Sequence, residues 1–256
     1  MSIVGFRELR EAILDYEGAR LYDEVLDPWI PKAKIAMAAL AHLAPAAAMS
    51  LRADAIRDSL WNLFALSVVI DHLIDAQELA RFMEAIGASR IRESAFHPFW
   101  HEIVEVEEAT NQAQPPAILR EVWPGFVLGD LMLVRAGVRV SAGSDHLTKA
   151  IAERSTIYFT NYRAARPASD LSHGWGHNSR WRTSFRRDYA APAAFHYHVD
   201  GKLSGNDPLP DDSRYAELTR EAWIELVRHR CFVRCAKPHD DLWPYDLGYV
   251  EPRGRV

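Results

Sequence analysis

Residues 131–140 read LMLVRAGVRV, and the character of the chain changes at this stretch. It holds two short runs of residues that favour β-strands, separated by Ala136–Gly137. The chain before it has the spacing of helices, and the chain after it mixes strand-like runs with a helix. We therefore expect an α+β fold, with a helical N-terminal half followed by a mixed half that contains a small antiparallel sheet.

The helices expected before this stretch follow from apolar residues spaced three and four apart, which line one face of a helix. The clearest stripe consists of Leu60, Leu63, Ser67, Ile70 and Ile74. It predicts one long or kinked helix over residues 51–86, with Ser50 as its N-cap and Gly87 as its stop. The remaining helices are predicted over residues 6–26, 31–43, 99–108 and 115–123.

In the second half, the predicted elements follow from residues that favour turns and helix caps. Residues 195–203 are predicted to form a β-hairpin, because Asp200–Gly201 is a two-residue turn sequence. A helix is predicted over residues 219–230, with Thr219 as its cap.

The expected boundary between the two halves lies near Pro124–Gly125. It divides a helical region, 1–124, from a mixed α/β region, 125–256, that carries the candidate site. The sequence leaves open whether the two regions are separate domains or share one core.

The chain has 256 residues, of which 48% are hydrophobic and 25% charged, and a formal net charge of −5. These values exclude a wholly disordered or collagen-like chain, and the acidity argues against a general nucleic-acid-binding protein. The N-terminus lacks the pattern of a secretory signal, and no apolar run approaches the roughly 20 residues that cross a bilayer. Two cysteines make no disulfide framework. A cytoplasmic location without membrane contact is therefore expected.

Residues 172–188, SHGWGHNSRWRTSFRRD, are the richest candidate for ligand binding. Arginine pairs with carboxylate or phosphate through two hydrogen bonds, and glycine lets the backbone approach a ligand closely. This composition predicts a pocket for a small anionic molecule. The ligand-binding candidates are Arg180, Arg182, Arg186, Arg187, Trp175 and Trp181. In the alternative interpretation, the aromatic residues anchor a loop while the arginines stack on them or pair with acids of the helical half.

Four histidines in and after this segment are candidates for acid–base catalysis: His173, His177, His196 and His198. His196 and His198 are two apart, so both share one face of a strand, and Asp200 continues that face. Two imidazoles and a carboxylate suit zinc or iron, which makes these three a candidate metal site. The alternative is that Asp200 serves only as the first residue of a tight turn.

Two further clusters of chemically active residues are His229, Cys231, Cys235 and His239, and Asp71, Asp75 and Glu78. The first cluster lacks the Cys-x-x-Cys spacing of zinc sites and is interpreted mainly as core positions. The second lies along one edge of the predicted long helix, where a solvated acidic edge is commoner than a magnesium site.

The leading hypothesis is an enzyme or binding protein that acts on a small anionic ligand through an Arg/His/Trp-rich pocket, with or without a bound metal. No sequence motif for nucleophilic catalysis is present. The alternative is a non-catalytic protein that binds a protein partner, such as an inhibitor, adaptor or immunity-type protein. Arg, Trp and Tyr dominate interface hot spots, and the acidic tail contains Trp243 and Tyr245. The sequence defines neither a substrate nor an oligomeric state.

Overall fold

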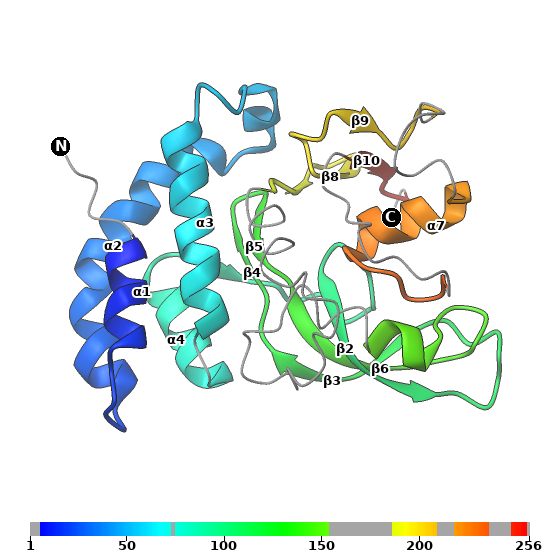
Figure 1. Cartoon of the computed structure of the whole chain (residues 1–256), viewed down its shortest axis with the longest axis horizontal. Helices are drawn as coiled ribbons and strands as arrows, with labels where there is room; N and C mark the ends of the chain where they lie inside the picture. The colour runs from blue at the N-terminus through cyan, green and yellow to red at the C-terminus, as the bar shows by residue number, and fades with distance from the viewer. Residues whose placement is uncertain (1–5, 73–74, 154–185, 209–217, 236–246, 255–256) are drawn as a thin grey trace.

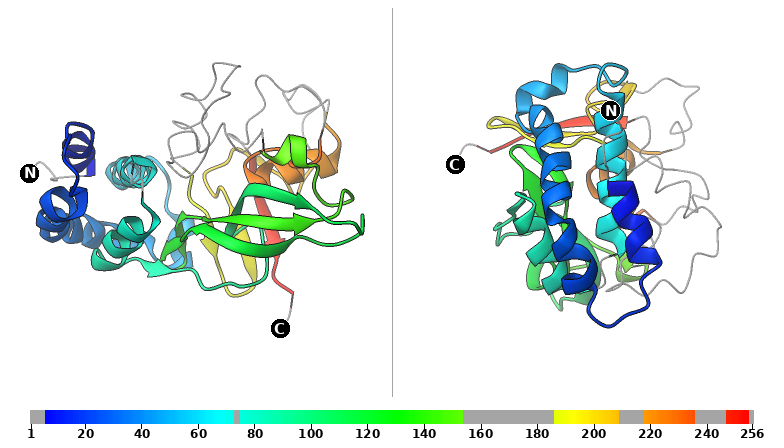
Figure 2. Two further views of the ribbon diagram at one scale, coloured as in Figure 1. Left: turned by 90° about the horizontal axis from the view of Figure 1, so that it is seen from below. Right: turned by 90° about the vertical axis from the view of Figure 1, so that its left-hand side faces the viewer.

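The computed structural model describes residues 6–72, 75–153, 186–208, 218–235 and 247–254. It confirms the predicted α+β class: helices come first along the chain, and strands in two sheets follow (Figure 1). The first four α-helices form a layer at one end of the molecule, beside the strands (Figure 2). No helix within these ranges is long and apolar enough to cross a membrane.

The helices of this layer are α1 (Phe6–Leu14), α2 (Asp27–Leu40), α3 (Arg57–His72) and α4 (Ala76–Ala85). Short helical turns occupy Tyr22–Leu26, Ala41–Leu43 and Ala46–Ser50. Helix α1 buries Phe6, Leu9 and Ile13, whose spacing of three and four places them on one face. The helical spacing seen in the sequence therefore reflects a real apolar face.

The single helix predicted over residues 51–86 is two helices, α3 and α4. Asp75 separates them, because its carboxylate accepts hydrogen bonds from the backbone N–H groups of Gln77 and Glu78 at 2.7 and 3.0 Å. This N-cap satisfies donors that would otherwise lack partners and so starts a new helix. Gly87 follows α4 as the predicted stop, with the positive φ of 96° that glycine tolerates best.

The strands form two sheets. The seven-stranded sheet has the order β1 (Ser89–Arg90), β4 (Phe126–Leu128), β5 (Leu131–Val134), β7 (Tyr189–Ala190), β8 (Ala194–Tyr197), β10 (Leu247–Pro252), β9 (Leu203–Ser204). The three-stranded sheet has the order β2 (His101–Glu108), β6 (Ala136–Ala142), β3 (Ala117–Trp123). Neighbouring strands are antiparallel except for β2 with β6 and β9 with β10.

Residues 131–140 form two strands, as predicted, but these strands belong to different sheets. Strand β5 lies in the seven-stranded sheet and β6 in the three-stranded sheet. The residue between them is Arg135, which is only 2% exposed. The point at which the chain passes from one sheet to the other is therefore occupied by a buried cation.

The helices predicted over residues 99–108 and 115–123 are wrong, because these residues form β2 and β3. In β2 the pairing with β6 shifts between Ile103 and Glu105. Such a bulge adds one residue and breaks the strict alternation by which a strand is recognised. Strands therefore begin at Ser89 rather than after residue 124.

The hairpin predicted over residues 195–203 is also wrong. A turn is present, but it is centred on Val199–Asp200 rather than on Asp200–Gly201, since the Gly201 N–H donates to the carbonyl of His198 at 2.9 Å. However, β8 and β9 both pair with β10, which lies between them. A Cβ on Gly201 would lie 2.5 Å from the backbone nitrogen of Gly248, so this glycine permits the close approach of β10.

Three hydrophobic clusters form the core. The first joins the helical layer to the seven-stranded sheet, with Leu9 and Phe82 in the same cluster as Phe126 and Leu131. The second packs α7 (Arg220–His229) with residues of β8 and β10, and the third joins β2 and β6 to residues 231–233. Thr219 caps α7 as predicted, because its hydroxyl accepts from the Ala222 N–H at 3.2 Å.

Candidate anion-binding site

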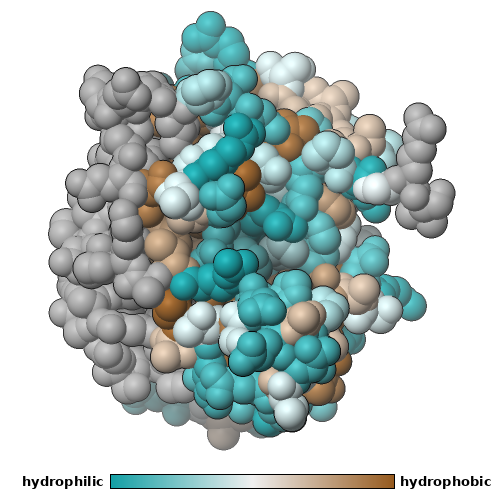
Figure 3. All heavy atoms as spheres, turned by 90° about the vertical axis from the view of Figure 1, so that its right-hand side faces the viewer, coloured by the Kyte–Doolittle hydropathy of each residue, from teal (hydrophilic) through white to brown (hydrophobic). Residues whose placement is uncertain are grey.

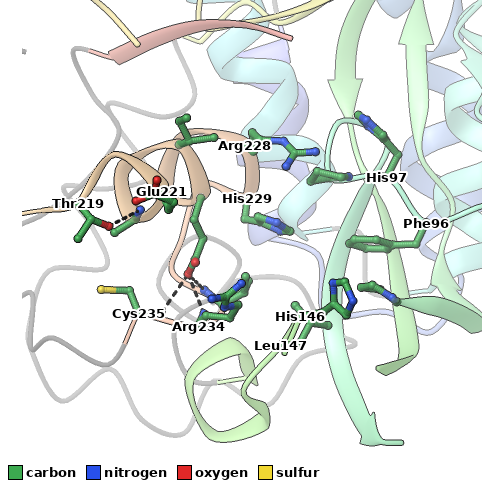
Figure 4. A pocket seen from close by; sticks show the side chains of 16 residues that line it. Phe96, His97, His146, Leu147, Thr219, Glu221, Arg228, His229, Arg234 and Cys235 are labelled. Atoms are coloured by element: carbon green, nitrogen blue, oxygen red, sulfur yellow. Dashed lines mark hydrogen bonds between the residues drawn. The ribbon is translucent and has the colours of Figure 1, made fainter. Parts of the chain in front are cut away.

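A pocket of about 620 Å³ lies between α7 and residues 96–98, the segment that precedes β2. Arg228 and His229 reach into it from α7, and Phe96 and His97 face them from the other side (Figure 4). Its volume is in the range of small-molecule sites. The end of the molecule near α7 presents mostly hydrophilic side chains, with hydrophobic ones between them (Figure 3).

Aromatic rings line one side of this pocket. The Phe96 ring is nearly parallel to the ring of His229, with centroids 6.3 Å apart, and to that of His101, with centroids 5.8 Å apart. His101 is fixed by the backbone, because its Nδ1 accepts from the His97 N–H and its Nε2 donates to the carbonyl of Glu93, each at 3.1 Å. Burial lowers the pKa of His101, so the ring is neutral.

Glu251 organises the α7 side of the pocket. It accepts hydrogen bonds from Nε of Arg228 at 3.0 Å and from the Tyr197 hydroxyl at 2.7 Å, and Arg228 Nη2 lies 2.6 Å from its second oxygen. The Nε2 atom of His97 is 3.7 Å from the same carboxylate. The charge of Arg228 is therefore neutralised within the wall.

A second group of charged residues, which we call the arginine cluster, consists of Arg135, Arg186 and Arg230 around Asp188. Arg186 Nε donates to one oxygen of Asp188 at 2.7 Å, and Arg230 Nη2 donates to the other at 2.8 Å. The Arg135 guanidinium is 3.7 Å from Asp188, beyond hydrogen-bond distance. Three positive groups thus share one carboxylate.

Donors of the arginine cluster remain unused. Within the part of the chain that the structure describes, none of the three guanidinium nitrogens of Arg135 has a hydrogen-bond partner, although all are buried. The same is true of Nη1 of Arg186 and Nε of Arg230. Buried polar atoms in proteins nearly always have partners, so five such nitrogens in one place require an explanation.

The charges of the arginine cluster influence the groups around them. Burial would raise the pKa of Asp188, but the three arginines lower it far below its usual value. Burial, together with Arg230 and Arg186, lowers the pKa of Arg135 to about 9, which leaves it charged at neutral pH.

The pocket histidines respond to the same positive potential. Burial lowers the pKa of His97 to about 4, against the effect of Glu251, and Arg228 and Arg135 lower it further. Burial likewise lowers the pKa of His229, with added repulsion from Arg228 and Arg135. Both imidazoles are therefore neutral at pH 7, in surroundings that favour a negative charge.

The residues predicted from sequence are distributed over several places. His173, Trp175, His177, Arg180, Trp181 and Arg182 lie outside the described residues, and so do His239, Trp243 and Tyr245. Arg186 belongs to the arginine cluster. Arg187 has another environment, where it pairs with both oxygens of Asp200 at 2.7 and 2.8 Å. These two described arginines thus bond to carboxylates of the fold, but Asp188 and Asp200 belong to the second half of the chain and not to the helical half that the alternative interpretation named.

The structure does not bring His196, His198 and Asp200 together as metal ligands. His198 has φ of 52° and leaves the strand, so it does not continue the face of His196. Its Nδ1 lies 3.1 Å from the carbonyl of Leu247, while Asp200 is paired with Arg187. Among the described residues, no group of three or more His, Cys, Asp or Glu side chains is placed to hold a metal ion.

The two weaker clusters also have other roles. Asp75 is the N-cap of α4, so its carboxylate is used by the backbone. Cys231 is buried in the third hydrophobic cluster, as the core interpretation expected, whereas His229 and Cys235 line the pocket.

Arg135 and His97 were not identified from the sequence. Arg135 is the single charged residue within residues 131–138, and a cation inside an apolar run is itself a signal of a buried ion. His97 lies in the run FHPFWH at 96–101, just before and within the start of the helix predicted over residues 99–108. Because residues 99–108 were predicted as a helix rather than as part of a strand, this segment was not predicted to belong to a site.

No protein-family model matches this chain, and no curated protein or solved structure is similar to it. The site is therefore interpreted from its own geometry and chemistry.

Proposed function

We propose that this protein binds a small anionic molecule at the arginine cluster. The observation that carries the proposal is Arg135: its side chain is 2% exposed, it is charged, and it has no hydrogen-bond partner in the described part of the chain.

Electrostatics gives the physical reason. A buried ion is costly unless it is paired and hydrogen-bonded. Asp188 is hydrogen-bonded to Arg186 and Arg230, and it also accepts from the His198 backbone N–H at 2.7 Å. Its oxygens are thus already occupied, which leaves an excess of two positive charges in the arginine cluster. A bound anion would remove this excess and supply acceptors for the unused donors.

Arg230 is the most exposed member of the arginine cluster: its side chain is 24% exposed, against 2% for Arg135 and 1% for Arg186. It follows α7 directly and has φ of 61°, which turns the chain at the end of the helix. Arg228 and His229, on the last turn of α7, line the pocket. An anion that binds at the cluster would meet three guanidinium groups that share the single carboxylate of Asp188.

Thermal unfolding with different anions tests the proposal. The protein is dialysed into a buffer without oxyanions, and its melting temperature is compared in phosphate, sulfate, acetate and chloride at equal ionic strength. An anion present at about 100 times its Kd stabilises a protein by about 2.7 kcal/mol. For a chain of this size, that corresponds to a rise of about 5 °C. We expect this rise with at least one oxyanion and none with chloride.

Two variants give the test its specificity. Arg135→Met keeps the length of the side chain and removes the charge, so the response to the oxyanion should disappear. Arg120→Gln is the matched control, because Arg120 is 58% exposed and lies 3.7 Å from Glu105 on the surface. Equal anion responses in the parent, Arg135→Met and Arg120→Gln proteins would refute binding at the cluster.

A further inference from the structure

The pocket between α7 and residues 96–98 is separate from the arginine cluster. Its walls come from these two segments and also from residues 146–147 and 233–235. No member of the arginine cluster is among the described residues that line it. The side chains of the pocket itself therefore decide what it can bind, independently of anion binding at the cluster.

The described lining residues include four charged side chains, two of each sign: Glu221, Glu225, Arg228 and Arg234. Two of these four are held by the fold. Arg228 is paired with Glu251, with Nη2 2.6 Å from the carboxylate. One oxygen of Glu225 accepts hydrogen bonds from three successive backbone N–H groups, at residues 233–235, at 2.6, 2.7 and 3.2 Å. Their charges are thus already engaged within the walls of the pocket.

The other two charged side chains, Glu221 and Arg234, are free to pair with a ligand. Both residues are exposed, and they form no ion pair with each other or with another residue that the structure describes. A simple anion here would be repelled by Glu221, and a simple cation would be repelled by Arg234. A ligand that pairs with both side chains must itself carry a cation and an anion.

Glu221 and Arg234 are close enough for one small molecule to contact both. Glu221 and Glu225 are four residues apart on α7, so they share one face of the helix and lie about 6 Å apart along its axis. The backbone N–H of Arg234 donates to Glu225 at 2.7 Å, which holds residue 234 beside the next turn of the helix. Figure 4 shows Glu221 on α7 and Arg234 on the segment that follows this helix.

The rest of the pocket is suited to an apolar group. Phe96, Pro98, Leu147 and Ile224 contribute to its lining. The His229 imidazole, which is neutral at pH 7, is nearly parallel to the Phe96 ring, with centroids 6.3 Å apart. Apolar and aromatic surfaces of this kind favour the burial of an apolar side chain and disfavour a further unpaired charge.

We propose that this pocket binds a zwitterionic α-amino acid with a large apolar side chain. Its ammonium group pairs with Glu221 and its carboxylate pairs with Arg234. Its side chain packs against Phe96 and Ile224. An α-amino acid fits because its two charges are adjacent, like the two free charges of the pocket, and because its third substituent is directed away from them into the apolar part.

A set of four probes tests each part of this recognition. Isothermal titration calorimetry on the full chain compares phenylalanine with phenylalanine amide, N-acetylphenylalanine and glycine. The amide lacks the carboxylate, the N-acetyl compound lacks the ammonium group, and glycine lacks the apolar side chain. We expect phenylalanine to bind at least about tenfold more tightly than each of the other three.

Two variants assign the two charges. Glu221→Gln should weaken phenylalanine to the level of N-acetylphenylalanine, because the variant no longer attracts the ammonium group. Arg234→Gln should weaken phenylalanine to the level of the amide, because the carboxylate loses its partner. Glu8→Gln is the matched control, since Glu8 is also an exposed glutamate in the first turn of a helix, but it lies on α1 in the helical layer. It should bind phenylalanine as tightly as the parent does.

Three outcomes would overturn this inference. Phenylalanine may fail to bind at millimolar concentration, or all four probes may bind equally. In the third outcome, inorganic phosphate competes with phenylalanine, which would place the amino acid at the arginine cluster. None of these results decides whether the cluster binds an anion, because inorganic anions test that proposal in the absence of an amino acid.

Discussion

Arg187 and Arg135 are both buried, but their surroundings are opposite. Arg187 donates to both oxygens of Asp200 at 2.7 and 2.8 Å and to the carbonyls of Ala48 and Leu51 at 2.9 and 2.8 Å. Arg135 makes no hydrogen bond from its guanidinium within the described residues, and its nearest carboxylate is 3.7 Å away. Arg187 therefore ties the sheet to the helical layer, whereas Arg135 leaves its donors unused.

This difference distinguishes two buried arginines that have the same residue type and similar exposed fractions. Arg187 is balanced by a carboxylate of its own, and its remaining donors bond to backbone carbonyls. In the arginine cluster, Asp188 accepts hydrogen bonds from Arg186 and Arg230, whereas Arg135 has only a longer contact with the same carboxylate, at 3.7 Å. The use of donors, rather than burial, thus distinguishes these two arginines, and only Arg135 has the unused donors that the proposed function requires.

Replacement of the shared carboxylate should have the largest effect. Asp188→Asn leaves two buried guanidinium groups and the partly exposed one of Arg230 without a counter-charge, and we expect a loss of about 5 kcal/mol in the free energy of unfolding. Urea denaturation at pH 7 measures it. Added phosphate should restore part of this stability, because an anion bound to the cluster replaces the missing charge. A loss under about 1 kcal/mol would mean that the three arginines do not depend on Asp188.

Removal of the balanced arginine should have a somewhat smaller effect. Arg187→Met leaves Asp200 unpaired, but the Asp200 side chain is 16% exposed and retains some hydration. We expect a loss of about 3 kcal/mol by the same denaturation experiment. Phosphate should not restore it, since the missing charge here is positive. Recovery in phosphate would contradict the assignment of Arg187 as a purely structural ion.

Acid should add a further positive charge to the cluster through His198. Burial lowers its pKa from 6.5 to about 4, with repulsion from Arg186 opposed by Asp188 and Asp200. The pKa of His198 is lower in the folded protein than in the unfolded chain. The stability that its neutral imidazole contributes is therefore fully present above pH 6.5. It is lost as pH falls toward 4, by about 3 kcal/mol.

His198→Asn provides the comparison for this pH effect. Asparagine tolerates the positive φ of residue 198 and does not titrate. The unfolding free energy of the variant should therefore fall less steeply than that of the parent between pH 6.5 and 4. Parallel pH profiles for the two proteins would show that His198 is not the group responsible.

We expect the smallest effect for Arg135→Met in a buffer without oxyanions. Its sign is opposite to the others, because this variant should be more stable than the parent. Removal of a buried and unpaired charge should raise the free energy of unfolding by about 1 kcal/mol. Arg120→Gln should stay within about 0.5 kcal/mol of the parent, as surface changes do. A substantial loss of stability in Arg135→Met would give Arg135 the same structural role as Arg187.

Some of the site could be anticipated from the sequence, and some could not. The excess of arginine late in the chain indicated an anionic ligand, and Arg186 is part of the cluster. Arg135 and His97 were not predicted as site residues, because the segments around them were interpreted only for their secondary structure. The metal-site interpretation of His196, His198 and Asp200 assumed a continuous strand, but the φ of 52° at His198 ends that regularity.

Local sequence signals by themselves determined the α+β class, the strands at residues 131–134 and 136–142, the stop at Gly87 and the cap of α7 at Thr219. These features depend on side-chain spacing and on backbone groups a few residues away, so they can be read along the chain. Tertiary structure decided that β10 separates β8 from β9, that β5 and β6 enter different sheets, and that Arg135, Arg186 and Arg230 meet at Asp188. Those arrangements bring together residues up to about a hundred positions apart. Tertiary packing determines which of these distant residues pair, and local sequence patterns do not predict it.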